Sequence, residues 1–144
     1  MRRIITTCAL TLAIFAGGAI AHAEVQNEAV KARMAAMKAI GGAMKTVGGM
    51  AQGKVPFDAD AAAAAIAVME AQSAQVPALF EAEESDPKSE AKPEIWTNWD
   101  DFVMKSEALN AAAKAADSSS PEALGASLGA MGGACKSCHT AYRL

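Results

Sequence analysis

This chain of 144 residues has few aromatic side chains, 5% of the total, and only three cysteines and two histidines. It shows no alternating pattern of the kind that predicts β-strands, no internal repeat and no sign of a second domain. It also lacks a surplus of positive charge, because 13 lysines and arginines stand against 16 aspartates and glutamates. That balance argues against nucleic-acid binding, since a phosphate backbone attracts basic proteins.

The first 23 residues have the pattern of a secretory signal peptide. A charged start, MRR, precedes an apolar run, and small residues at Ala21 and Ala23 suit a signal peptidase. The run is short for a membrane anchor, and no stop-transfer charges follow it. We therefore expect cleavage near Ala23, export of the protein, and one mature domain over residues 24–144 without a membrane span.

Cleavage would leave 121 residues, which is 144 minus 23, enough for one modest domain. The only charges in the removed segment are two arginines, so the net charge would fall from −3 to −5. Cys8 and His22 would leave with the segment. The mature chain would then keep two cysteines and one histidine.

The rest of the sequence is rich in alanine, methionine, lysine and glutamate, which are good helix formers. Four helices are predicted. The first covers residues about 25–50 and the second about 59–75. The third starts near Pro93 and ends at the serines 118–120, and the fourth runs from Pro121 onward. Asp58 and Ser120 are the expected N-caps of the second and fourth. Pro77 and the charged stretch after it are predicted to form the longest loop. The pattern predicts an all-α fold, an antiparallel up-down-up-down four-helix bundle.

Two faces of the first predicted helix differ in character. One carries apolar residues three or four apart: Val30, Met34, Met37, Gly41 and Met44. The other carries Lys31, Lys38 and Lys45.

The stretch GGACKSCHTAYRL near the C-terminus places Cys135, Cys138 and His139 together. A redox-active disulfide is disfavoured because no βαβ setting is visible. A structural disulfide at this spacing would constrain a very short loop and would stabilise the fold weakly. A zinc site needs four protein ligands, whereas the mature chain would offer two thiols and one imidazole.

Covalent attachment of haem is the remaining interpretation of this motif. Two thiols can add to the two vinyl groups of haem, and cysteines at i and i+3 lie on one helix face. His139 follows directly, so its imidazole can turn to the iron. Cys-x-x-Cys-His is the attachment motif of haem c, and an exported protein suits its assembly. Only five residues follow His139 and none is a methionine, so a sixth ligand must come from upstream.

With these features the chain resembles the class II c-type cytochromes, the cytochrome c prime family. The resemblance is carried by CKSCHTAYR (135–143), AVKARMAAMK (29–38) and KPEIW (92–96), and it covers essentially the whole mature chain. It implies an antiparallel four-helix bundle with one covalently bound haem c, located in the periplasm.

Helix geometry narrows the choice of a sixth ligand among the methionines. In an up-down-up-down bundle the first and fourth helices run antiparallel, so His139 is level with Met34 and Met37. Met44 and Met50 would lie on the order of 10–20 Å further along, at 1.5 Å per residue. The early first helix is therefore the best source.

The family resemblance favours Met37 within that region. MKAIGGAMK (37–45) is similar to the low-spin, c-556-type branch, in which a first-helix methionine binds the iron. Met69 and Met104 stay open if their helices flank the haem. The resemblance also implies that Arg33 contacts a haem propionate, and the alternative for Arg33 is a solvated surface charge.

Two functions remain open from the sequence. The first is electron transfer by an iron held between His139 and Met37, with periplasmic redox proteins as partners. The alternative is a five-coordinate cytochrome c prime that binds NO or CO. An enzyme is not expected, because the mature chain has no second histidine that could serve as an acid–base group on the distal side of the haem. Small residues in the first two helices are compatible with a homodimer, which members of the family often form.

Overall fold

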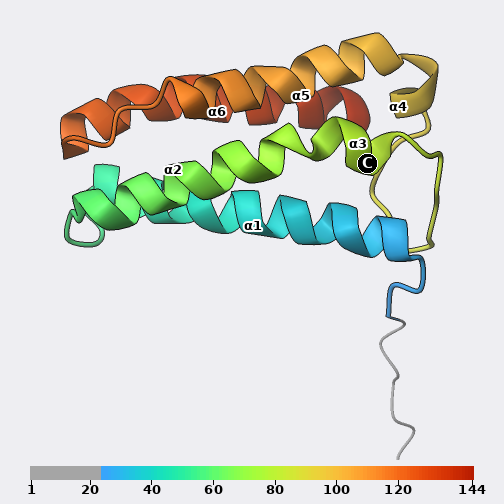
Figure 1. Cartoon of the computed structure of the whole chain (residues 1–144), viewed down its shortest axis with the longest axis horizontal. Helices are drawn as coiled ribbons and strands as arrows, with labels where there is room; N and C mark the ends of the chain where they lie inside the picture. The colour runs from blue at the N-terminus through green and yellow to red at the C-terminus, as the bar shows by residue number, and fades with distance from the viewer. Residues whose placement is uncertain (1–23) are drawn as a thin grey trace, which may run out of the picture.

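The computed structural model describes residues 24–144 as a bundle of four long helices (Figure 1). These are α1 (Glu28–Ala51), α2 (Ala59–Ala74), α5 (Trp99–Lys114) and α6 (Pro121–Tyr142). Successive long helices run in opposite directions, which confirms the predicted up-down-up-down arrangement. The expected signal peptide lies outside the described residues. Within 24–144, no helix is long and apolar enough to cross a membrane.

The predicted caps are present at two helix starts. The side chain of Asp58 accepts a hydrogen bond from the backbone N–H of Ala61 at 2.9 Å, and Ser120 accepts one from Ala123 at 3.1 Å. Each satisfies an amide at the helix start that has no partner inside the helix, which is typically worth about 1 kcal/mol. These bonds fix where α2 and α6 begin.

Two short helices correct the sequence-based prediction. The expected loop at Pro77 is wrong there, because residues Val76–Phe80 form α3, with the proline in its first turn. The third helix is not continuous either: α4 (Glu94–Thr97) is followed by the non-helical Asn98, and α5 starts at Trp99. Trp96 Nε1 donates to the carbonyl of Phe80 at 2.8 Å, so a tertiary contact sets the position of α4. Such a contact is invisible in local helix propensity.

The core runs along the length of the bundle and is built mostly from alanine and medium-sized aliphatic side chains. Its members with no exposed surface include Val47, Ala62, Met69, Leu124 and Met131. Alanine on facing helices lets backbones approach closely, so the four helices can pack with little side-chain volume between them.

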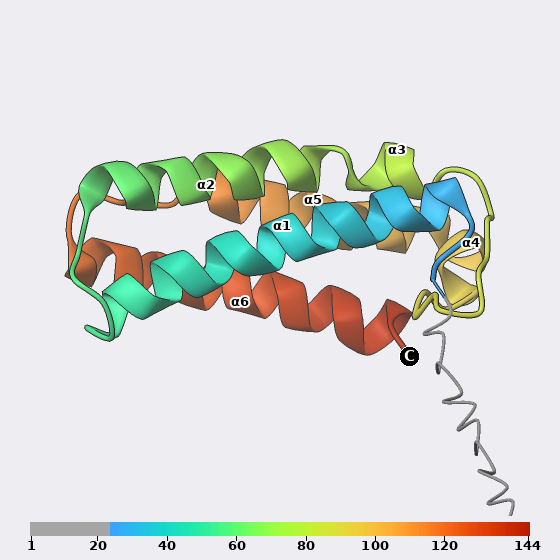
Figure 2. The same ribbon diagram turned by 90° about the horizontal axis from the view of Figure 1, so that it is seen from below.

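One end of the bundle is more open than the other. Among neighbouring long helices, α1 and α6 touch least. Figure 2 shows them diverging toward the end where α1 begins and α6 finishes. The chain between α3 and α4, residues 81–93, runs across this same end. The open end brings residues from the beginning and the end of the described segment, 24–144, to one place.

The carboxylate of Asp86 attaches the start of the chain to this connecting segment. It accepts hydrogen bonds from the backbone N–H groups of Gln26 (2.8 Å), Asn27 (3.1 Å) and Lys88 (2.9 Å). These bonds, that from Lys88 first, hold the pKa of Asp86 below its usual value because they favour the ionised form. The residue is largely buried, so water replaces these bonds poorly.

We expect Asp86→Asn to lower the melting temperature at neutral pH, because a neutral amide accepts these three bonds less strongly. A group with a depressed folded pKa stabilises the fold above its unfolded pKa, and this stabilisation is lost as pH falls through the folded value. The difference between wild type and variant should therefore shrink below about pH 4. Thermal unfolding followed by circular dichroism from pH 7 to about pH 2.5 measures it, with the exposed Glu83→Gln as control. A difference independent of pH would contradict this role.

Candidate functional site: a cleft between the first and last helices

A cleft of about 560 Å³ opens where α1 and α6 diverge. Its volume lies within the range of roughly 300–1,000 Å³ that is usual for small-molecule and cofactor sites. The wall on the α1 side consists of Val30, Arg33, Met34, Met37, Lys38 and Gly41. The α6 side consists of Cys138, His139, Tyr142 and Arg143, and the remainder comes from Phe80, Ile95, Phe102 and residues 88–91. The first and last helices of the described residues thus face each other across one space.

The α6 wall carries the predicted attachment motif. Cys138 and His139 line the cleft, while Cys135 lies one helical turn earlier and is also half-buried. Both cysteines are free thiols. Partial burial raises the pKa of each thiol, and for Cys138 the cation of Lys105 opposes that rise. A protonated thiol is a poor fit to a redox-active cysteine, which needs a thiolate.

The imidazole of His139 is suited to act as a ligand. Its pKa is lowered, first because part of the ring is out of water and second because Arg143 is nearby. Both effects favour the neutral ring, the form that binds metals. The residue as a whole remains exposed on the cleft wall, so the ring is accessible from within the cleft.

The α1 wall brings two methionines to the same cleft. Met37 is half-buried and packs against the core, whereas Met34 is 46% exposed. The other candidates lie elsewhere: Met69 is fully buried in the core and Met104 is 59% exposed. A Cβ atom built at Gly41, one turn after Met37, would meet nothing within 4 Å. The glycine therefore leaves free space in the wall beside the methionine.

The donor set of this cleft fits haem c. A sulfur from α1 and an imidazole and a thiol from α6 border one space whose other walls include aromatic and aliphatic side chains. Thioether and imidazole are known axial ligands of haem iron. Within residues 24–144, no group of three or more His, Cys, Asp or Glu side chains is placed to hold a bare metal ion.

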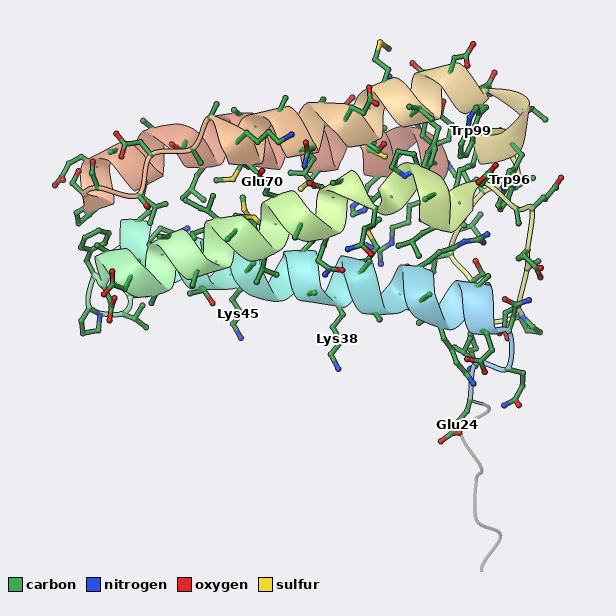
Figure 3. The ribbon with its side chains drawn as sticks, in the orientation of Figure 1. Glu24, Lys38, Lys45, Glu70, Trp96 and Trp99 are labelled. Atoms are coloured by element: carbon green, nitrogen blue, oxygen red, sulfur yellow. The ribbon has the colours of Figure 1, made fainter. Side chains whose placement is uncertain are left out.

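Arg33 is buried beneath the cleft, with 3% of its surface exposed, so the alternative of a solvated surface charge is wrong. Its guanidinium donates to three backbone carbonyls: Leu79 at 2.8 Å, Ala82 at 2.6 Å and Glu84 at 2.8 Å. The same group lies over the rings of Phe80 and Trp96, 4.7 and 5.4 Å from their centroids. Figure 3 shows Trp96 at this end of the bundle. Arg33 thus joins α1 to the end of α3 and the segment after it.

A second group of contacts, behind the α6 wall, was not predicted from the sequence. The hydroxyl of Tyr142 donates to the carboxylate of Asp101, which also accepts a bond from Lys105 at 2.9 Å. The bond to Asp101 raises the pKa of Tyr142 to about 12, so the phenol stays protonated. The ring of Tyr142 packs edge-on against Phe102, with centroids 5.4 Å apart. Asp101 and Tyr142 are 41 residues apart, and no local pattern pairs them.

Comparison with known proteins agrees with this geometry. Residues 28–143 match the sequence profile of a family described as Cytochrome C'. The chain is 36% identical over 116 residues to a cytochrome c-556 of Agrobacterium tumefaciens (strain apple 185), an alignment that covers 78% of this chain and 92% of that protein.

Solved structures give the same result. Cytochrome c' from Rhodopseudomonas palustris superposes with a TM-score of 0.76 at 32% identity, covering 83% of this chain and 98% of that one. A mutant of cytochrome c prime from Alcaligenes xylosoxidans, solved as its nitric oxide complex, superposes with a TM-score of 0.70 at 32% identity, covering 80% and 93%.

The contacts of Arg33 predict how its variants behave. Arg33→Met should lower the free energy of unfolding by about 2–4 kcal/mol, because three carbonyls lose their donor and this loss exceeds what is gained by no longer burying a cation. Arg33→Lys should recover only part of this loss, since an ammonium cannot reproduce the planar fork of donors. Urea denaturation of the three proteins measures the differences. A lysine variant as stable as wild type would show that charge alone matters at this position.

Proposed function

This chain belongs to the cytochrome c' family of monohaem c-type cytochromes, and from that premise we propose that it transfers electrons between proteins of the periplasm. The observation that carries the proposal is that Met37 and His139 line opposite walls of one cleft. Two protein ligands on one iron favour rapid electron exchange, because the coordination stays the same in both oxidation states. The expected signal peptide supports the location.

Haem c is the cofactor, and when bound it supplies a one-electron redox centre. We assign its covalent attachment to Cys135 and Cys138. Their spacing puts both sulfurs on the same side of α6, and their partial burial beside the cleft supports this assignment. His139 is assigned as an axial ligand of the iron, and its lowered pKa keeps the imidazole ready to bind.

Met37 is assigned as the second axial ligand. It lines the cleft from α1, it is better shielded from water than Met34, and Gly41 leaves space beside it. A thioether ligand raises the reduction potential relative to a second imidazole. The expected contact of Arg33 with a haem propionate would have to use the two N–H groups, of five, that do not bond carbonyls.

Gas binding is the second candidate function. It is supported by the similarity to a cytochrome c prime that was solved as a nitric oxide complex. In that case Met37 would cover an open iron site without binding it. The two candidates differ in one property, the coordination of the iron opposite His139.

A homodimer is also compatible with the small exposed side chains of α1 and α2, such as Ala35, Gly42 and Ala67.

The attachment proposal predicts that haem stays on the polypeptide after denaturation and acid–acetone extraction. Intact mass should equal the chain from Glu24 to Leu144 plus one haem, which also tests the cleavage site. Cys135→Ala and Cys138→Ala should each retain haem through one bond, whereas the double variant should release it to the organic phase. Ser137→Ala, between them, is the control and should behave as wild type. Release of haem from the wild-type protein would refute the assignment.

The ligand proposal predicts that Met37→Leu converts a low-spin protein to a high-spin one that binds carbon monoxide faster. The substitution nearly conserves volume, so it should cost less than about 1.5 kcal/mol of stability. Met34→Leu, on the same wall one turn earlier, is the matched control and should leave the spectrum unchanged. Absorption spectra of both oxidation states and stopped-flow CO binding provide the measurements. If Met37→Leu leaves the spectrum as it was, Met37 is a packing residue.

A further inference from the structure

The charges of the bundle are divided between its two sides. Helices α1 and α6 together carry five basic and two acidic side chains, while α2 and α5 carry five acidic and two basic ones. The mature chain as a whole is acidic, because removal of two arginines lowers the net charge from −3 to −5. The two helices that form the walls of the cleft therefore carry net positive charge, whereas the segment 81–93 across its open end carries five acidic and two basic side chains.

On α1 the positive charges form a row beside the cleft. Lys31, Lys38 and Lys45 are seven residues apart, which is close to two helical turns, so they lie on one side of the helix. Figure 3 shows Lys38 and Lys45 projecting from α1 away from the bundle. Lys31 pairs with Glu28 at 2.8 Å, but Lys38 and Lys45 have no carboxylate of residues 24–144 within 4.0 Å. Lys38 itself lines the cleft.

On α6 a matching charge lies on the other side of the cleft. Lys136 is exposed and has no ion-pair partner within the described part of the chain. It precedes the cleft-lining His139 by three residues, so both lie on the same side of α6. Arg143 is paired with Glu90, and its Nε donates to that carboxylate at 2.6 Å. Unpaired ammonium groups thus lie on both helices that form the cleft, with Lys38 in the lining and Lys136 one turn from the lining residue His139.

We propose that this cleft face, defined by Lys38, Lys45 and Lys136, is the docking surface for an acidic face of a redox partner protein. The proposal rests on the proposed electron-transfer function. Complementary charge fixes the orientation and raises the rate of encounter between proteins. The acidic side chains of α2 and α5 repel the same partner. The uneven distribution of charge therefore orients the protein with its cleft toward that partner. An ion pair at the edge of such a surface dissociates easily, as a carrier with successive partners requires.

Small charged reductants test the field at the cleft in the holoprotein. The oxidised protein is reduced by ferrous EDTA, an anion, and by hexaammineruthenium(II), a cation. Lys38→Glu/Lys136→Glu changes one residue on each wall. The control, Lys54→Glu/Lys114→Glu, makes the same change in net charge at exposed lysines that do not line the cleft.

We expect ferrous EDTA to react more slowly as salt rises, despite the negative net charge, because the local field attracts it. At an ionic strength of about 10 mM, where the Debye length is about 30 Å, the cleft variant should react about tenfold more slowly and the control no more than about twofold. With the cationic reductant, the cleft variant should react faster than wild type. Acceleration of ferrous EDTA by salt in the wild type, or equal effects in both variants, would overturn the proposal.

A second experiment identifies the occupant of the face. ¹⁵N-labelled holoprotein is titrated with a polyglutamate peptide, with vesicles containing phosphatidylglycerol, and with itself by sedimentation at increasing concentration. Peptide-induced shifts around Lys38, Lys45 and Lys136 that the cleft variant loses and the control keeps support the proposal. Binding to vesicles without binding to the peptide overturns it in favour of a membrane surface. A dimer that only the cleft variant disrupts overturns it in favour of a second copy.

The coordination of the iron and the charge of the cleft face are tested by separate measurements. If Met37 does not bind iron, the spectrum shows it, while the salt dependence still reports the charge of the cleft face. If the face attracts no anion, the low-spin spectrum is unaffected.

Discussion

The open end of the bundle depends on one buried cation. Arg33 extends from α1 into the interior, where it donates to three carbonyls at and beyond the end of α3 and lies over two aromatic rings. A guanidinium is costly to bury unless its donors are satisfied. Here the backbone supplies acceptors that the end of a short helix would otherwise leave without partners. One side chain thus holds α3 and the segment 81–93 against α1, and this end of the molecule keeps a defined wall for the cleft. Phe80, which Arg33 covers, is part of that wall.

The chemistry of the cleft follows from chain order. The thiols and imidazole stand near the end of α6, and the antiparallel course of the bundle brings the early part of α1 opposite them. The methionine proposed to complete the iron coordination is therefore almost a full chain length away in sequence. Because these two helices diverge at this end, the cleft opens there, and Lys38 lies in its lining.

Periodicity and capping predicted the long helices, because both are local properties. Asp58 and Ser120 could be identified as caps from their positions alone, and the Cys-x-x-Cys-His sequence lies in the last long helix, as expected. The break at Asn98 and the helix at Val76–Phe80 were missed because each depends on a contact with another element. Met34 and Met37 could be placed at the right level but not distinguished by pattern, since their difference in burial arises from packing. The hydrogen bonds of Arg33 could not be predicted from the sequence for the same reason, because its acceptors are backbone carbonyls 46 to 51 residues away.

The central claim is that the iron is held between His139 and Met37. The spin state of the unmodified holoprotein, measured by absorption and electron paramagnetic resonance at neutral pH, tests it most directly. We predict low-spin iron in the oxidised and in the reduced protein. High-spin iron in the reduced protein, with immediate binding of carbon monoxide, would contradict it.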